Sequence, residues 1–163
     1  MCYNFPMRKT GKKIRVVMVG GLPKAFGVSR SSVEEAACFF AERSRRRAGG
    51  VWHEVVVHLV RDDESDAMHR AIMGIAGATD VITQAYDAIP PEKPGLHGEL
   101  FVNTDQALRV APKRRGWSSA KELLLYIAHG MDHLSGADDH SEAGYRAMRR
   151  RELGWIRAFI STC

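Results

Sequence analysis

The sequence has few cysteines and no long apolar run. Cys2, Cys38 and Cys163 are scattered without C-x-x-C spacing, which argues against a disulfide framework and against a cysteine-based zinc site. No apolar stretch approaches the ~20 residues that span a bilayer, and residues 1–6 lack the basic start and apolar core of a signal peptide. These absences favour a cytoplasmic protein that has no membrane partner.

Phosphate-binding loops are absent as well. Neither G-x-x-x-x-G-K nor G-x-G-x-x-G occurs, so no nucleotide cofactor is expected. The 163 residues carry a formal net charge of +5, and arginine and lysine cluster at 43–47, 113–115 and 149–151. Such clusters are usually solvated, but they also suit a polyanion, because each phosphate contact releases counterions. Composition alone therefore leaves nucleic acid open as a partner.

Hydrophobic patterning predicts strands and helices that alternate along one chain. Strands are expected at 14–19, 52–60, 79–83 and 97–103, and helices at about 31–47, 62–75, 104–110, 119–135 and 142–160. Expected helix caps are Ser31 or Ser32, Asp62 or Asp63, and Ser119. The length suits one domain. We expect a single α+β domain over residues 14–163, with a mixed sheet of about four strands and helices packed on it, after a basic tail at 1–13.

One segment, residues 128–140, carries most of the chemistry. On a helix His129 and His133 project from one face, so both imidazoles can reach one ion at the roughly 2.0–2.1 Å zinc–nitrogen distance. Gly136 can adopt the left-handed conformation that ends a helix and turns the chain back. The returning chain offers three candidates for a third ligand: Asp138, Asp139 and His140. A histidine pair alone is more often incidental, but this combination predicts an open zinc site on a central helix.

The segment resembles the signature H-G-x-L-H-L-x-G-Y-D-H of the bacterial YbeY family of ribosomal RNA maturation factors. His129-Gly130 and His133-Leu134-Ser135-Gly136 are in register with it, and Asp138 stands at the family's aspartate. Thr79-Asp80-Val81-Ile82-Thr83-Gln84 is similar to the family's T-D-V-L-S-F strand, and Gly98-Glu99-Leu100 to its G-D-I strand. The resemblance runs from about Glu54 to the C-terminus.

The resemblance implies a metalloprotease-like fold and a zinc-dependent, single-strand-specific endoribonuclease. This activity would serve maturation of the 3′ end of 16S ribosomal RNA and ribosome quality control. The cofactor would be one Zn²⁺ ion, although sites of histidine and carboxylate also accept nickel, cobalt or iron. The partners would be single-stranded RNA, including ribosomal RNA, and the ribosome or its small subunit.

The third ligand differs from the family pattern. Read without a gap, Asp139 occupies the position of the family's third histidine, and His140 falls one residue later. Register favours Asp139 and ligand type favours His140, so both stay open. The residue that is not bound would orient a ligand through a hydrogen bond. Asp132 and Ala137 also depart from the family, which has leucine and tyrosine there.

A family arginine is also missing. The family's Y-R-G-K-D segment corresponds to residues 72–76, so Met73 holds the arginine position. The change removes a cation that can hold a scissile phosphate. Arg70, one helical turn earlier, is a weak candidate to replace it, although a solvated helix residue is the simpler interpretation. The alternative function is therefore a catalytically weakened, metal-containing RNA-binding factor associated with the ribosome.

The general base is not assigned. Gly130 stands where an H-E-x-x-H peptidase has its glutamate, which argues against the third hypothesis, a metallopeptidase. Asp132 should point about 100° away from His133 around the helix, which argues against it as the base. Asp80 and Glu99 are candidates for acids in the cleft, because the family places their strands beside the metal, but ordinary carboxylates at strand ends are an equal alternative and neither is assigned a catalytic role. The loop 113–115 is expected to contact RNA, because it leads into the histidine helix.

Overall fold

The computed structural model describes residues 14–162 and contains a four-stranded mixed sheet. The predicted tail at 1–13, with Cys2, and the terminal Cys163 lie outside the described residues. The strands are β1 (Arg15–Val19), β2 (Trp52–Val60), β3 (Val81–Asp87) and β4 (Leu96–Asn103). Their order is β1-β2-β4-β3, in which β3 is an antiparallel edge strand and the other pairs are parallel.

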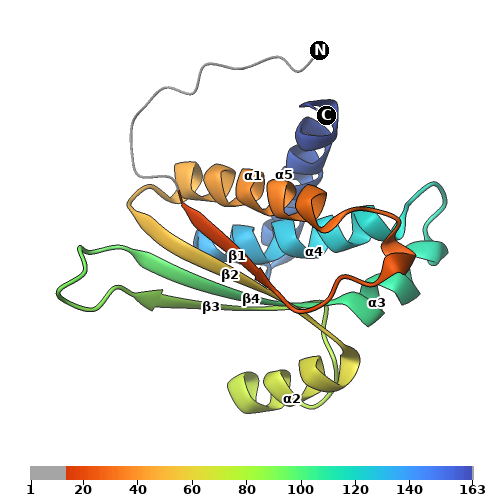
Figure 1. Ribbon diagram of the computed structural model, residues 1–163, viewed down its shortest axis with the longest axis horizontal. Coiled ribbons are helices and arrows are strands. Elements are labelled where there is room, and N and C mark those ends of the chain that lie inside the picture. Colours follow the sequence, from red (N-terminus) through yellow and green to blue (C-terminus); the bar gives the residue numbers. More distant parts are fainter. Residues whose placement is uncertain (1–13, 163) are drawn as a thin grey trace.

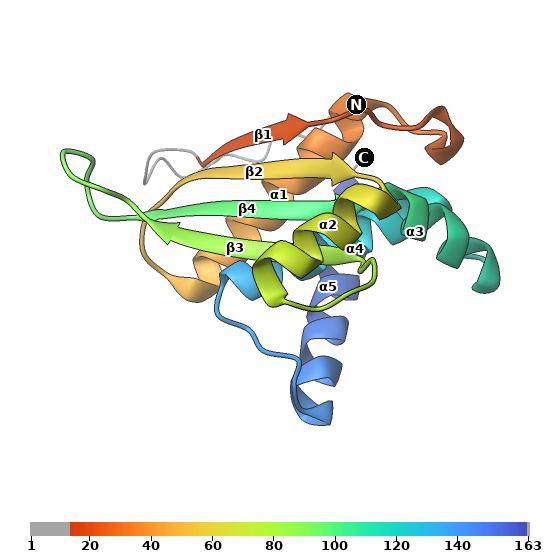
Figure 2. The same ribbon diagram turned by 90° about the horizontal axis from the view of Figure 1, so that it is seen from below.

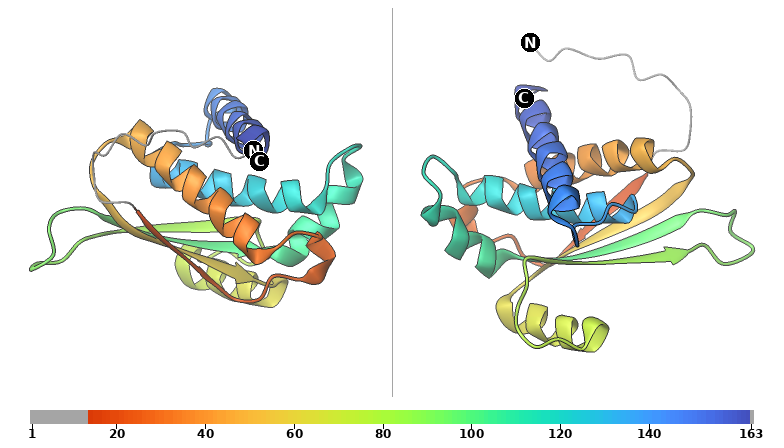
Figure 3. Two further views of the ribbon diagram at one scale, coloured as in Figure 1. Left: turned by 45° about the horizontal axis from the view of Figure 1, so that its top comes forward. Right: turned by 180° about the vertical axis from the view of Figure 1, so that it is seen from behind.

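The helices lie on both faces of this sheet. They are α1 (Arg30–Ala48), α2 (Asp62–Met73), α3 (Thr104–Val110), α4 (Ser119–Leu134) and α5 (Glu142–Thr162), with short 3-10 helices η1 (Lys24–Phe26) and η2 (Ala111–Lys113). Helices α1 and α4 cover one face, whereas α2 lies against one end of the other face (Figures 1 and 2). Helix α5 crosses α1 and α4 on the side away from the sheet (Figure 3).

The hydrophobic core lies between the sheet and the pair α1 and α4. Side chains alternate along each strand, so Val55 and Val57 of β2 and Leu100 and Val102 of β4 all face these helices and are fully buried. Burying each such side chain contributes about 1.5–3 kcal/mol. The expected single α+β domain is confirmed, and β2 lies in the interior of the sheet, between β1 and β4. Within residues 14–162, none of the helices has the length and apolar character that crossing a membrane requires.

Two glycines let the C-terminal end of α4 approach the sheet closely. A Cβ atom at Gly130 of α4 would lie 2.6 Å from Cδ2 of Leu100 and 3.0 Å from Cγ2 of Val81. A Cβ atom at Gly98 of β4 would lie 2.6 Å from Cδ1 of Leu134. Both positions therefore have room only for hydrogen, and the last turns of α4 rest directly on β3 and β4.

The expected helix caps are wrong by one to three residues. Ser29 rather than Ser31 or Ser32 caps α1, Arg61 rather than Asp62 or Asp63 precedes α2, and Ser118 rather than Ser119 caps α4. A cap must have extended backbone angles, and a run of similar polar residues does not reveal which of them has those angles. Asp62 instead accepts hydrogen bonds from Asn103 and Arg109. The third strand begins at Val81, later than expected, and continues to Asp87.

Candidate metal centre

The candidate centre lies at the C-terminal end of α4 and in the chain that returns from it. Gly136 has φ +82, and its N–H donates to the carbonyl of His133 at 2.9 Å. This turn ends the helix and brings Asp139 back to the two imidazoles, His129 and His133. The expected turn at Gly136 is confirmed.

Three side chains direct ligand atoms at one point. The Nε2 atoms of His129 and His133 are 3.1 Å apart. Asp139 Oδ2 lies 3.4 Å from Nε2 of His129, and its Oδ1 lies 3.8 Å from Nε2 of His133. Tetrahedral ligands at the zinc–nitrogen distance are separated by roughly 3.3 Å. The donor set and its spacing therefore fit a small divalent cation such as Zn²⁺.

The outer ring nitrogens fix how the imidazoles are protonated. His129 Nδ1 lies 2.6 Å from Oε1 of Glu152, and His133 Nδ1 lies 3.0 Å from the carbonyl oxygen of Ala137. Because both partners are acceptors, each Nδ1 carries the proton and each Nε2 offers a lone pair to a cation. Metal-binding histidines commonly have such partners.

Sequence reasoning missed Glu152. This carboxylate comes from α5, is fully buried, and also lies 3.6 Å from Arg149. It occupies the same inward face of α5 as Met148, Trp155 and Ile156. A charged residue in an otherwise apolar helical stripe was the available signal, because carboxylates are almost never fully buried unless they are paired.

The carboxylates around His129 favour positive charge at the centre. Burial lowers the pKa of His129, but the hydrogen bond and negative charge of Glu152 outweigh burial and raise that pKa above its usual value. The charges of Asp80 and Asp139 act in the same direction. The centre therefore has a net attraction for a cation, whether that is a proton or a metal ion.

The structure separates the two candidates for the third ligand. Among the described residues, the group that contains both α4 histidines contains Asp139 and does not contain His140. The side chain of His140 is 90% exposed and lies 3.6 Å from Asp138. These two residues form a second group with Asp139.

A groove of about 360 Å³ runs along the edge strand β3 beside this centre. Two residues of α2, His69 and Met73, line it from one side, and His133, Leu134, Asp139 and His140 line it from the other. Between them lie residues of β3 and the segment before it: Thr79, Val81, Ile82, Thr83 and Ala85. The groove therefore adjoins the candidate centre, because His133 and Asp139 line both.

Asp132 lies away from the centre. It is fully buried and accepts hydrogen bonds from Nε and a terminal nitrogen of Arg151 at 2.7–2.9 Å. This pair joins α4 to α5, next to the contact between His129 and Glu152. Asp132 therefore has a packing role, in agreement with the argument against it as a base.

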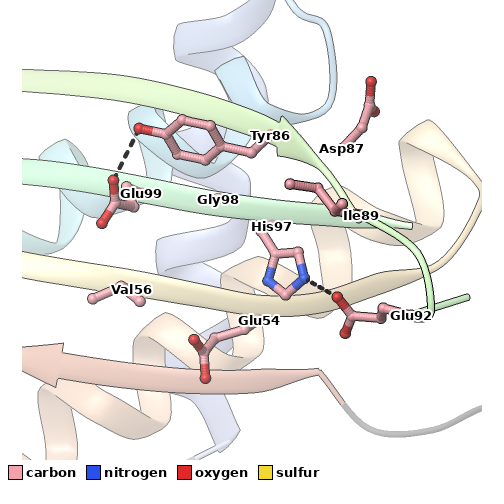
Figure 4. A pocket seen from close by; sticks show the side chains of 9 residues that line it. All are labelled: Glu54, Val56, Tyr86, Asp87, Ile89, Glu92, His97, Gly98 and Glu99. Atoms are coloured by element: carbon pink, nitrogen blue, oxygen red, sulfur yellow. Dashed lines mark hydrogen bonds and ion pairs between the residues drawn. The ribbon is translucent and has the colours of Figure 1, made fainter. Parts of the chain in front are cut away.

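The two expected cleft acids lie in different places. Asp80 is near enough to raise the pKa of His129, although its Oδ1 also accepts a hydrogen bond from the backbone N–H of Val81. The expectation for Glu99 is wrong. Leu100 faces α4, so its neighbour Glu99 faces the opposite side of the sheet, where it bonds to Tyr86 in another hollow (Figure 4).

The basic candidates do not line the groove. Arg70 is 61% exposed and binds Asp66 on its own helix at 3.0 Å. Arg114 of the loop 113–115 binds the buried Glu122 at 3.0 Å. That loop adjoins the N-terminal end of α4, about 15 Å along the helix axis from His129.

Comparisons with known proteins give one family. A sequence model described as Endoribonuclease YbeY matches residues 28–159. The Endoribonuclease YbeY of Anaeromyxobacter sp. (strain Fw109-5) is 33% identical over 83% of this chain and 67% of that protein. The Endoribonuclease YbeY of Rhodopirellula baltica is 40% identical over 48% of this chain, and the match spans only 40% of that longer protein. The solution structure of TM1509 from Thermotoga maritima has the same fold, with a TM-score of 0.56, 22% identity, and coverage of 90% of this chain and 88% of that one.

Proposed function

The chain belongs to the YbeY family, and from this premise we propose that it is a metal-dependent endoribonuclease that cleaves single-stranded RNA. The observation that carries the proposal is the convergence of His129, His133 and Asp139 beside an open groove. Relatives bear the name endoribonuclease, and the proposed substrate is therefore RNA. The finer proposal is maturation of the 3′ end of 16S ribosomal RNA and ribosome quality control, on the small subunit and in the cytoplasm.

The proposed ligands of one Zn²⁺ ion are His129, His133 and Asp139. Their mutual distances of 3.1–3.8 Å support this set, and the exposure of His140 argues against it as the third ligand. When bound, the ion would lower the pKa of a water molecule towards about 7 and polarise a phosphoryl oxygen.

The protein's own groups prepare this chemistry. Glu152 and the carbonyl of Ala137 hold the two imidazole rings so that both Nε2 atoms face the same point. Glu152 and Asp139 supply negative charge that compensates a divalent cation. Residues of β3 line the groove, and within residues 14–162 this strand is at the edge of the sheet, so backbone groups on its outer side can hydrogen-bond to an extended substrate.

A peptidase mechanism is disfavoured by packing at Gly130. An H-E-x-x-H peptidase carries its general base at this position. Here the position faces β3 and β4, and even a Cβ atom would lie 2.6 Å from Leu100. A glutamate side chain at this position therefore has no space on the sheet side of α4.

One observation favours the alternative of an RNA-binding factor without cleavage. Met73 lines the groove, is 58% exposed and carries no charge, whereas Arg70 binds Asp66 instead. A groove that holds metal and RNA but lacks the family's arginine would still bind RNA, but it would cleave the RNA more slowly, because the charge that develops on the phosphate is less stabilised.

Incubation of the purified protein with single-stranded RNA, with zinc or with a chelator, tests both candidates. We expect chelator-sensitive cleavage that His129→Ala and Asp139→Ala abolish together with bound zinc, while His140→Ala retains both. RNA binding without cleavage would favour the alternative function. Loss of zinc in His140→Ala but not in Asp139→Ala would overturn the proposed ligand set.

A further inference from the structure

A third histidine lines the groove from the side opposite the proposed ligands. His69 comes from α2, whereas His133 and Asp139 come from α4 and the chain after it. The strand β3 lies between the two sides, so a nucleotide strand in the groove would pass between His69 and the candidate centre.

The ring of His69 is held by one hydrogen bond. Its Nδ1 lies 2.7 Å from the carbonyl oxygen of Gly77. A carbonyl only accepts hydrogen bonds, so Nδ1 carries a proton. Within residues 14–162, Nε2 of His69 has no hydrogen-bond partner. In the neutral ring this nitrogen is an acceptor, and it becomes a donor only when the ring takes up a second proton.

The groove contains no other cationic side chain on the α2 side. The residues that line it include neither lysine nor arginine, although a phosphodiester brings one negative charge per nucleotide. Arg70, the neighbour of His69, turns to Asp66. His69 is therefore the residue of α2 that can meet a phosphate with positive charge.

We propose that His69 binds a phosphate of the RNA strand by donating its Nε2–H to a phosphate oxygen. This inference rests on the proposed function and identifies a substrate-contacting residue for it. Because the carbonyl oxygen of Gly77 accepts the Nδ1 proton, only the imidazolium form of His69 can donate an Nε2–H to the phosphate. The charged groups nearest to this step are Asp66 and Arg70 on α2, with His133, Asp139 and His140 across the groove.

Fluorescence anisotropy with a labelled 2′-O-methyl oligouridylate tests the proposal on the zinc-loaded protein, because this probe resists cleavage. At about pH 6, His69→Gln should weaken binding about tenfold, the effect of losing one hydrogen bond to a charged group. It should also reduce the slope of log K against log salt by about 0.7, the value for one phosphate on a single strand. At about pH 8 the difference between the variant and the wild type should be smaller than at pH 6, because the neutral ring has no Nε2–H.

Two further variants separate contact from structure. Arg70→Gln removes a neighbouring charge that is paired with Asp66 and does not line the groove, and it should change affinity by less than about twofold. His69→Lys should restore tight binding at both pH values, because lysine keeps its charge. An equal loss for His69→Gln at both pH values, no loss at either, or an equal loss for Arg70→Gln would overturn the inference. RNA cleavage by the wild type with such a result would leave the proposed function intact, whereas a wild type that neither binds nor cleaves RNA would overturn both.

Discussion

Replacement of Glu152 tests whether the metal centre depends on a contact between two helices. The carboxylate accepts a hydrogen bond from Nδ1 of His129 at 2.6 Å and is fully buried. In Glu152→Gln the amide oxygen can still accept this bond, but the negative charge is lost. In Glu152→Ala both the bond and the charge are lost. We therefore expect zinc affinity to fall in both variants, and further in the alanine variant.

The expected magnitude follows from the role of such outer partners. Their loss typically lowers metal affinity 10- to 100-fold, which corresponds to about 1.4–2.7 kcal/mol. Glu152→Gln should lie near the lower value and Glu152→Ala near the upper one. Glu152 also raises the pKa of His129, so a proton competes more strongly with zinc in the wild type. The difference between wild type and Glu152→Gln should therefore be largest at about pH 8 and shrink as the pH falls.

Competitive zinc titration against a chromophoric chelator measures the effect directly. Glu142→Gln is the matched control, because Glu142 lies on the same helix, is exposed and pairs only with Arg146 within the described chain. It should bind zinc like the wild type. Wild-type affinity in folded Glu152→Ala, or an equal loss in Glu142→Gln, would refute the reasoning.

Three further outcomes are expected. Gly130→Ala should lower the free energy of unfolding, measured by urea denaturation, by about 1–3 kcal/mol. Gly154→Ala is the control and should not lower it, because its added Cβ atom meets nothing within 4 Å. Equal effects of the two substitutions would contradict the close approach of α4 to the sheet. Asp132→Ala should cost about 3 kcal/mol in thermal unfolding, because Arg151 is left without its partner; a loss below about 1 kcal/mol would contradict this. In the metal-free protein, the pKa of His129 is higher in the folded state than in the unfolded state, where it is about 6.5. Protonated His129 therefore stabilises the fold at pH values below about 6.5, and this contribution is lost as the pH rises through the pKa of the folded state. The difference in unfolding free energy between wild type and His129→Gln should therefore decrease from acid to alkaline pH, and a constant difference would contradict the pairing with Glu152.

Local features of the candidate centre could be predicted from the sequence. Helical spacing predicts that His129 and His133 share a face, and Gly136 predicts where the chain turns, because both depend on a few neighbouring residues. The choice between Asp139 and His140 depends on the path of a loop, where a shift of one residue costs little. The structure places Asp139 near the pair, and the ligand set itself stays a proposal.

Features that depend on tertiary packing could not be predicted from the sequence. Glu152 and Arg151 contact α4 because of how α5 crosses it, and no local pattern gives that crossing. The position of Glu99, in contrast, could have been predicted from the alternation of side chains along a strand. Leu100 faces the helices, so the alternation of strand side chains already placed Glu99 on the other face.

The order in which the chain is made matters for the proposed metal centre, because α5 follows the residues that it supports. Arg151 and Glu152 are adjacent, yet each contacts a different residue of α4, Asp132 or His129. Rotation or sliding of α5 by one turn would break both contacts together. During synthesis the two histidines emerge before Glu152, so we expect the proposed centre to reach its full metal affinity only after α5 has docked. Full metal affinity of the proposed centre would therefore report that α5 has docked on α4.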